Sequence, residues 1–404
     1  MKKTLLLISV VLLALVFASC MRVAPGNSAG ANVEFVWKQI QDAPYVEGRL
    51  IVGYSDIEAL SEIVSLLDAE ITIDIPRLNA AGLRFDSTVE EARGAIRELF
   101  VERPELVASI RYIEPNYERE LIKPVKDDNL KLPELPVVLA EDTFPDLEGF
   151  LWGIKKVRAP QAWAAGYDGT GIIVAVLDTG IDSTHPDLQG QITHRYDPFL
   201  DLEIDPDIDY SFEAHGSHVA GTIAAKDDGS GVIGVAPGAK IMDIPIFQPN
   251  YIGDEFVAAG IVYAIENGAT VLSNSWGGKG FSTLLYDAIA YASENYVVFV
   301  NSAGNEHVNE VKSPAMYPGV VVVAASTAGD GITHFSSRSV KLSVAAPGDF
   351  SILSTVPLWD VAEFAYPDLP YAYYGGTSMA CPHVSGAIAI LQQKYKDMGL
   401  TVYQ

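Results

Sequence analysis

The 404-residue sequence predicts an α/β protein built on a parallel sheet and preceded by a smaller α+β domain. Three observations support this prediction. Residues 45–120 contain strand and helix patterns in the order β-α-β-β-α-β. Residues 148–404 alternate short apolar runs with helical patterns, and residues 121–147 between them are rich in Pro, Lys and Asp without periodicity.

Composition and charge exclude some classes of protein. Hydrophobic residues make up 49% of the chain and charged residues 20%, which is typical of a folded globular protein. The formal net charge of −25 repels nucleic acid and anionic membranes, while its carboxylates are ligands that calcium prefers. We therefore expect no nucleic-acid partner, and we expect a monomer.

Residues 1–20 have the pattern of an export signal, with two lysines followed by an apolar stretch too short to favour a permanent membrane span. The run Phe-Ala-Ser-Cys20 also resembles a bacterial lipobox, in which Cys20 would carry a lipid and residues 21–44 would form a flexible tail. Ordinary signal cleavage is the alternative. Both predict a secreted protein, and the lipid would hold it to the cell envelope before processing. With Cys381 the only other cysteine, no disulfide is expected.

Residues 45–120 predict a ferredoxin-like unit. We expect helices at 56–68 and about 88–102, each beginning with capping-box spacing, Ser55 to Glu58 and Thr88 to Glu91. The expected strands are 49–54, 70–75, 80–86 and 109–115. Residues 121–147 then predict an exposed linker, a natural region for proteolytic cleavage.

Beyond residue 148, continuous apolar runs predict buried parallel strands with helices on both faces of the sheet. These runs are 172–177, 239–247, 270–274, 296–301 and 320–325. A helix is expected at 378–396.

Three segments place a reactive side chain where a strand ends or a helix begins: Val-Leu-Asp178-Thr-Gly, His215-Gly-Ser-His-Val-Ala-Gly and Gly-Thr-Ser378-Met-Ala. Ligands of parallel α/β sheets bind outside the carboxyl ends of the strands, which is where Asp178 falls. Taken alone, Asp178 would more often be a helix cap or a turn residue than a catalytic residue. His215 at the start of a helix is similarly ambiguous. The combination is far more specific.

Together these segments resemble the signatures of the subtilisin-like serine peptidases, the subtilases, including the chain order Asp, His, Ser. The resemblance spans about residues 147–396, and residues 45–117 resemble the propeptide of that family. It implies a secreted serine endopeptidase that acts on proteins or peptides. Its own propeptide would serve as intramolecular chaperone and inhibitor, and autocleavage within 121–147 would release activity.

The resemblance also implies a role for each site residue. Ser378 would be the nucleophile, His215 its general base, and Asp178 the carboxylate that orients the imidazole. Asn305, after Gly304, would donate to the oxyanion, although a plain turn is the alternative for this Asn.

Substrate contacts are implied elsewhere in the chain. Ser275-Trp276-Gly277 resembles the edge segment against which subtilases align an extended substrate, flanked by 250–253. By position, Lys312 would lie near the pocket for the residue before the cleaved bond and favour acidic or short side chains there. An exposed lysine without a role is the alternative.

A structural calcium site is implied by the loop from Lys226 to Val232. Carboxylates suit calcium, as do turn carbonyls. A plain Asp-Gly turn is the alternative. The implied ligands are Asp187, Asp228, Glu148 and the carbonyls of Lys226, Ser230 and Val232.

No zinc pattern and no catalytic cofactor are expected, and Cys381 is interpreted as a small buried residue. The chain departs from the family at Ala214 and at Ser217, where Thr is usual. It also ends at Gln404, shortly after the helix carrying Ser378, so the native chain is expected to continue.

Two other functions are compatible with parts of the pattern. A catalytically inactive surface protein could bind peptides in the same cleft, but the presence of all three triad residues and Asn305 argues against it. An esterase with a nucleophile elbow would need Gly-x-Ser-x-Gly around Ser378, which is absent.

Overall fold

The computed structural model describes residues 42–125, 131, 133–135, 145–249, 253–359 and 369–400. Several segments lie outside this part of the chain: the expected signal, Cys20, most of the tail, much of the linker, residues 250–252 and the last four residues. Within it, no helix is long and apolar enough to cross a bilayer.

The N-terminal domain, residues 45–117, has the predicted order of elements. Its four strands form an antiparallel sheet in the order β2-β3-β1-β4, with α3 and α4 packed against one face. The elements are β1 (Tyr45–Tyr54), α3 (Ile57–Leu67), β2 (Glu70–Ile75), η1 (Pro76–Leu78), β3 (Ala80–Arg84), α4 (Val89–Glu102), η2 (Pro104–Ser109) and β4 (Ile110–Tyr117).

One of the two predicted helix caps is confirmed and one is wrong. Thr88 and Glu91 form the reciprocal capping box at the start of α4. At α3, however, the cap is Asp56, whose carboxylate accepts the backbone N–H of Glu58. The hydroxyl of Ser55 donates instead to the carbonyl of Ser109, so it is not available to the helix.

The C-terminal domain is built on an eight-stranded sheet in the order β14-β13-β12-β10-β6-β9-β7-β8. All neighbours are parallel except β7 and β8. The strands are β6 (Ile173–Asp178), β7 (Ile192–Asp197), β8 (Leu202–Glu203), β9 (Lys240–Pro245), β10 (Val271–Asn274), β12 (Val298–Ser302), β13 (Val320–Ser326) and β14 (Val344–Pro347). The five predicted strands are confirmed; β7, β8 and β14 were not predicted.

Helices cover both faces of this sheet, as predicted. Along β6, Val174 and Val176 join one apolar core, and Ala175 and Leu177 join the other. The first core contains α7 (Ala214–Ala224) and α10 (Thr377–Asp397), and the second contains α8 (Asp254–Glu266) and α9 (Thr283–Glu294). Smaller elements complete the domain: η3 (Glu148–Phe150), α5 (Trp152–Lys156), α6 (Ala159–Ala164), β15 (Ile352–Thr355) and β16 (Tyr371–Tyr374).

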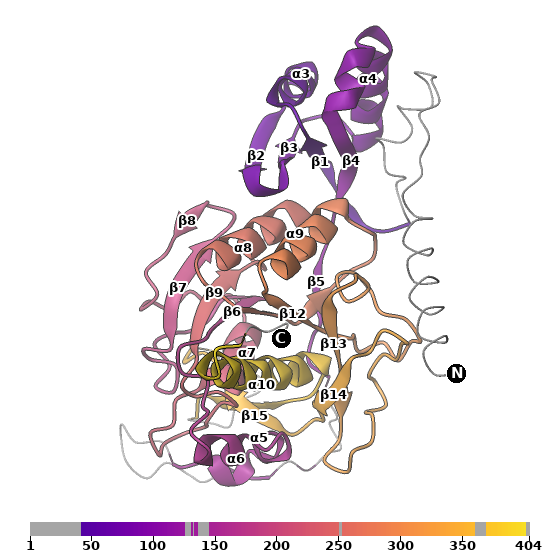
Figure 1. The fold of residues 1–404 in the computed structure, drawn as a ribbon. Coiled ribbons are helices and arrows are strands. Elements are labelled where there is room, and N and C mark those ends of the chain that lie inside the picture. The colour runs from indigo at the N-terminus through magenta and orange to yellow at the C-terminus, as the bar shows by residue number, and fades with distance from the viewer. Residues whose placement is uncertain are drawn as a thin grey trace, which may run out of the picture.

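The N-terminal domain sits on α8 and α9 (Figure 1) and completes their first turns. The first N–H groups of a helix lack partners within the helix. Asn116 accepts the N–H of Asp254 at 2.7 Å, and Glu114 accepts those of Thr283 at 2.8 Å and Leu284 at 3.0 Å. The two domains are therefore joined by buried hydrogen bonds as well as by apolar contact.

Candidate active site

Three elements of the C-terminal domain bring Asp178, His215 and Ser378 together. Asp178 is the last residue of β6, His215 is the second residue of α7, and Ser378 is the second residue of α10. All three are buried. Because parallel strands end at one edge of the sheet and both helices begin there, residues far apart in sequence meet at one place.

Asp178 and His215 form a buried pair. Nδ1 of His215 lies 2.8 Å from Oδ1 of Asp178, which also accepts the N–H of Thr179 at 2.8 Å. This contact orients the ring so that Nε2 is the nitrogen left for proton transfer. Among the described residues Nε2 has no hydrogen-bond partner.

Ser378 directs its hydroxyl to a segment from the N-terminal side of the chain. Its Oγ donates to the carbonyl oxygen of Ile122 at 2.6 Å rather than to His215. Ser378 and His215 therefore form no hydrogen bond with each other in this structure, because a carbonyl group lies against the hydroxyl.

The segment around Ile122 corrects the sequence-based prediction of an exposed linker beginning at residue 121. Glu120 and Leu121 form β5, which pairs antiparallel with β11 (Trp276–Gly277). The N–H of Ile122 donates to Ser275 O at 3.2 Å, and that of Val125 to Gly375 O at 2.8 Å. Residues 120–125 thus lie in the cleft as an added strand, and the segment Ser275-Trp276-Gly277 is the edge with which they pair.

Asn305 lies next to Thr377, the residue before Ser378. Its Oδ1 accepts both the N–H and the hydroxyl of Thr377, each at 2.9 Å, and its Nδ2 donates to the carbonyl of Lys123 at 3.0 Å. Gly304 has a φ of 101°, a conformation that L side chains rarely adopt. The amide is therefore held in one orientation, with its donor directed at the strand in the cleft.

Lys312 lies in the cleft, which has a volume of about 660 Å³. Its Nζ is 2.6 Å from Glu306 and 3.6 Å from Glu120. Burial opposes both charges of the Lys312–Glu306 pair, but the ion pair outweighs burial, so the pKa of Lys312 is raised and that of Glu306 is lowered. The lysine charge that was expected to favour acidic side chains is already balanced by Glu306.

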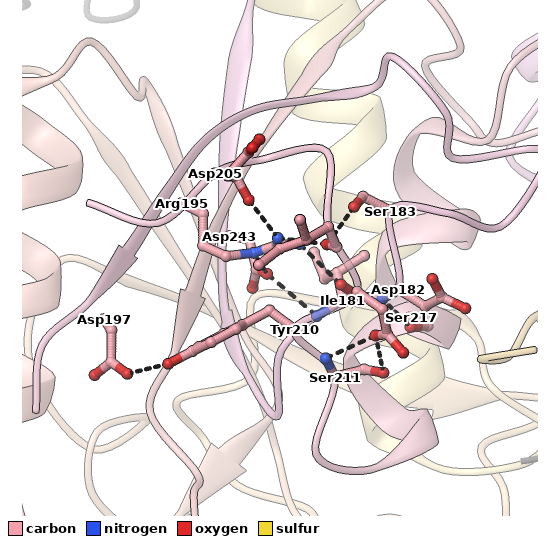
Figure 2. Close-up of polar contacts among 12 residues, drawn as sticks. Ile181, Asp182, Ser183, Arg195, Asp197, Asp205, Tyr210, Ser211, Ser217 and Asp243 are labelled. Atoms are coloured by element: carbon pink, nitrogen blue, oxygen red, sulfur yellow. Dashed lines mark hydrogen bonds and ion pairs between the residues drawn. The ribbon is translucent and has the colours of Figure 1, made fainter. Parts of the chain in front are cut away.

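A buried arginine that the sequence did not point to fixes the segment after β6 (Figure 2). Arg195 of β7 donates through Nε to Asp243 at 2.7 Å and through Nη2 to the carbonyl of Ile181 at 2.8 Å. The next residue, Asp182, donates its N–H to Oγ of Ser217 at 2.9 Å. Since Ser217 lies on α7, these contacts fix the end of β6 relative to the helix that carries His215.

The loop expected to bind calcium surrounds a buried carboxylate. Asp187 accepts the N–H of Val232 at 2.8 Å, and burial raises its pKa to about 7. A cavity of about 180 Å³ is lined by Glu148 and by residues 226–233, among them Val232, whose N–H Asp187 accepts. In the described part of the chain no group of three or more His, Cys, Asp or Glu side chains could hold a metal, so carbonyl oxygens would have to supply ligands. The side chains of Lys226 and Asp228 pair with each other at 2.9 Å.

Three further histidines, His185, His218 and His383, and the thiol of Cys381 are buried and structural. His185, His218 and His383 each contact a backbone carbonyl, and burial lowers their pKa values to about 4, 3 and 4. Burial raises the pKa of the Cys381 thiol to about 11, which leaves it protonated and unreactive at neutral pH.

This fold and this site define a class of protein: a serine hydrolase of the α/β type whose cleft is filled by a strand from its own N-terminal side. Comparison with known proteins agrees. Residues 169–404 match the subtilase family, and residues 31–116 match the fervidolysin N-terminal prodomain. The chain therefore belongs to the subtilase family of serine peptidases.

Two relatives cover most of the chain. It is 40% identical to fervidolysin of Fervidobacterium pennivorans over 98% of this chain and 61% of that protein. It is 32% identical to a probable subtilase-type serine protease of Deinococcus radiodurans over 88% of this chain and 50% of that protein. The crystal structure of fervidolysin, described as a keratinolytic enzyme related to subtilisin, matches with a TM-score of 0.78 at 41% identity, over 90% of this chain and 57% of that one. The chain thus spans about half to three-fifths of the length of these proteins.

Proposed function

We propose that this chain is a serine endopeptidase made as an inhibited precursor, with the N-terminal domain as its inhibitor. The observation that carries the proposal is the strand in the cleft. Residues 120–121 pair with β11, and Ile122 bonds to Ser275 beside it, as an extended substrate would. The carbonyl oxygen of Ile122 lies 2.6 Å from the hydroxyl of Ser378. The cleft therefore already holds a peptide in a position close to that required for attack.

In the proposed reaction, Ser378 Oγ attacks the carbonyl carbon of the substrate while Nε2 of His215 takes the hydroxyl proton. Asp178, 2.8 Å from Nδ1, stabilises the imidazolium that results. His215 then gives the proton to the leaving amine as the C–N bond breaks, which leaves an acyl group on Ser378. A water molecule, activated in turn by His215, hydrolyses this ester and restores the serine.

The tetrahedral intermediates carry a negative oxygen, for which we propose two donors: Nδ2 of Asn305 and the backbone N–H of Ser378. Thr377 holds the amide of Asn305 through two bonds of 2.9 Å, so the donor needs little reorganisation during the reaction. The first turn of α10 adds its dipole at the same point.

We propose the Ile122–Lys123 peptide as the bond cut during processing. Ser275 accepts the N–H of Ile122, and Ser378 contacts its carbonyl oxygen. Asn305 contacts the next carbonyl, that of Lys123, so the Ile122 carbonyl must turn from the hydroxyl of Ser378 towards this fixed amide before the amide can stabilise its oxyanion. The test is N-terminal sequencing of the processed protein: Lys123 is the expected first residue, and a product beginning at Pro124 would contradict this assignment.

We also propose structural calcium at the loop of residues 226–232. The ligands would be the buried Asp187 carboxylate, Glu148, Asp228 and the carbonyls of residues 226, 230 and 232, and because no three acidic side chains converge in the described structure, side chains would have to turn to reach the ion. Bound calcium would supply the positive charge that buried Asp187 lacks, and the side chains of Lys226 and Asp228 would have to separate for Asp228 to bind it. No step of the peptidase reaction requires this ion.

For localisation, we propose export directed by residues 1–20. Either ordinary signal cleavage follows, or Cys20 is lipidated. Because the lipid would lie on the N-terminal side of the Ile122–Lys123 bond, processing would also free the peptidase from the membrane.

The deciding experiment is covalent labelling of the processed protein by a fluorophosphonate, which reacts with activated serines. We expect one labelled peptide, and tandem mass spectrometry should place the label on Ser378. The Ser378→Ala variant should show no labelling and no processing, whereas Ser385→Ala, which changes a buried serine on the same helix, should retain both. A folded, processed protein that takes no label would refute the peptidase proposal.

A further inference from the structure

An arginine at the end of the N-terminal domain fills a pocket beside the cleft. The side chain of Arg119 is fully buried and forms a two-point ion pair with Asp254, from Nε to Oδ1 at 2.6 Å and from Nη2 to Oδ2 at 2.7 Å. Its Nη1 donates to the carbonyl oxygens of Lys279 at 2.8 Å and Gly280 at 3.4 Å. All of these acceptors belong to the C-terminal domain, so they stay with it when the N-terminal domain leaves.

The pocket lies at a fixed place along the cleft. Glu120 pairs with Gly277 and Leu121 with Trp276, and these pairs set the register of the strand. Ile122, whose carbonyl meets Ser378, is the first residue before the proposed cleavage point, so Arg119 is the fourth. A substrate that lies on β11 in the same register would place its fourth residue at Asp254.

The chemistry of the pocket matches a guanidinium group. Asp254 is the first residue of α8 and is 0% exposed while Arg119 and the N-terminal domain cover it, so any chain that covers it in the same way must supply a cation. A carboxylate and two carbonyl oxygens arranged around a flat group suit the fork of donors of arginine better than the compact ammonium of lysine.

The wall of the pocket is tight. A Cβ atom on Gly278 would lie 2.7 Å from the carbonyl oxygen of Glu118 and 3.1 Å from Nη1 of Arg119. The peptide backbone and the guanidinium group therefore approach this glycine closely, which only a residue without a side chain permits.

We propose that the Asp254 pocket is a substrate-recognition site that selects arginine at the fourth residue before the cleaved bond. The inference rests on the proposed endopeptidase function and adds to it a residue preference, with Asp254 as the residue that determines it. In the uncut chain Arg119 occupies the pocket. After the N-terminal domain has left, an arginine of the substrate binds there instead.

The test compares fluorogenic peptides that have the sequence of residues 117–125 and differ only at the position of Arg119. Arginine, lysine and leucine are placed there, and the enzyme is the processed product of the full-length chain, with its active sites counted by fluorophosphonate. We expect kcat/KM to be about tenfold or more higher for arginine than for leucine, since hydrogen bonds to charged groups have energies of this order, with lysine between them. Equal values for arginine and leucine would overturn the proposal.

Variants then assign the preference to the pocket. In Asp254→Asn, the ratio of arginine to leucine should fall to near one, because the side chain keeps its size and loses its charge. Glu255→Gln is the matched control: it removes a buried charge from the next residue, which pairs with Arg49 rather than with Arg119, and the ratio should stay as in the wild type. An unchanged ratio in Asp254→Asn would also overturn the proposal.

Failure of the peptidase proposal can be told apart from failure of the pocket. If the processed protein cleaves none of the peptides, the endopeptidase function is refuted and the pocket is judged by binding alone. Fluorescence anisotropy should then show the labelled arginine peptide binding at least about tenfold more tightly than the leucine peptide. Equal affinities would overturn the arginine site.

Discussion

At the scale of single residues, Asn305 connects two parts of the site. Its Oδ1 accepts the N–H of Thr377 at 2.9 Å at the start of α10, and its Nδ2 faces the carbonyl of Lys123 at 3.0 Å. The residue therefore helps to fix the helix that presents Ser378 and also supplies a donor to the strand in the cleft. A change at Asn305 should consequently affect the rate of reaction far more than the binding of substrate.

We predict that Asn305→Leu, which has a side chain of similar size, lowers kcat by about 10²–10³ because one oxyanion donor is lost. KM should change little, since the donor acts mainly on the transition state. Steady-state kinetics on one peptide substrate measures both. Asn309→Leu, an exposed position on the same loop, is the control and should retain wild-type kinetics; a loss below threefold in Asn305→Leu would remove Asn305 from the proposed oxyanion site.

The sequence pointed to the residues that we propose for the chemistry, but not to the buried residues that hold the segments around them. Asp178, His215 and Ser378 stand in short local signatures, which can be recognised without knowing the fold. The pairs Arg195–Asp243 and Arg119–Asp254 join residues 48 and 135 positions apart. Nothing local marks either arginine as buried, because a single arginine is usually exposed.

At the scale of elements, regular patterns were predicted well and short edge strands were not. The helices of the N-terminal domain and the buried strands such as β6 follow directly from the spacing of apolar residues. β8 has only two residues and β5 has two, and each is a strand only because a partner lies beside it. The segment at residues 121–125 has the composition of a linker, so its place in the cleft could not be predicted from its own residues.

The calcium loop is the element whose proposal is simplest to test. We predict that calcium raises the unfolding temperature of the full-length Ser378→Ala chain, which cannot digest itself. A concentration of about 100 times Kd should add about 2.7 kcal/mol, or about 5–10 °C for a domain of this size. Calorimetry with calcium and with a chelator measures the difference.

In Asp187→Asn, which removes the buried carboxylate, this dependence on calcium should be lost. The control is Asp207→Asn, an exposed acidic residue outside the loop, where the dependence should remain. Equal unfolding temperatures of the parent chain in calcium and in chelator would contradict the proposed site.

At the scale of the whole molecule, burial of histidines makes stability depend on pH. Burial lowers the pKa of His383 to about 4, and its Nδ1 contacts the carbonyl of Met379 at 2.8 Å. In the unfolded chain the same group has a pKa of about 6.5. Its contribution to stability is therefore fully present above pH 6.5 and is lost as the pH falls towards 4, because the unfolded chain binds the proton first.

We predict that His383→Asn, which keeps a donor for Met379, makes the Ser378→Ala chain less sensitive to acid. Between pH 7 and pH 5 the free energy of unfolding should fall by about 2 kcal/mol more in the chain that has His383 than in the variant. Denaturant unfolding of both chains at the two pH values gives this difference. Parallel losses in the two chains would show that His383 is not the group responsible.

The way in which the N-terminal domain is docked has a consequence for the timing of activation. Cutting the Ile122–Lys123 bond removes one covalent link, but Glu114 and Asn116 still cap α9 and α8, and Arg119 still fills its pocket. The N–H of Ile122 would remain on the carbonyl of Ser275, and the new carboxylate would lie against the hydroxyl of Ser378, where it would block the cleft. We therefore expect a delay between the proposed cut and the onset of activity, because a foreign chain can enter the cleft only after the docked domain has been released or digested.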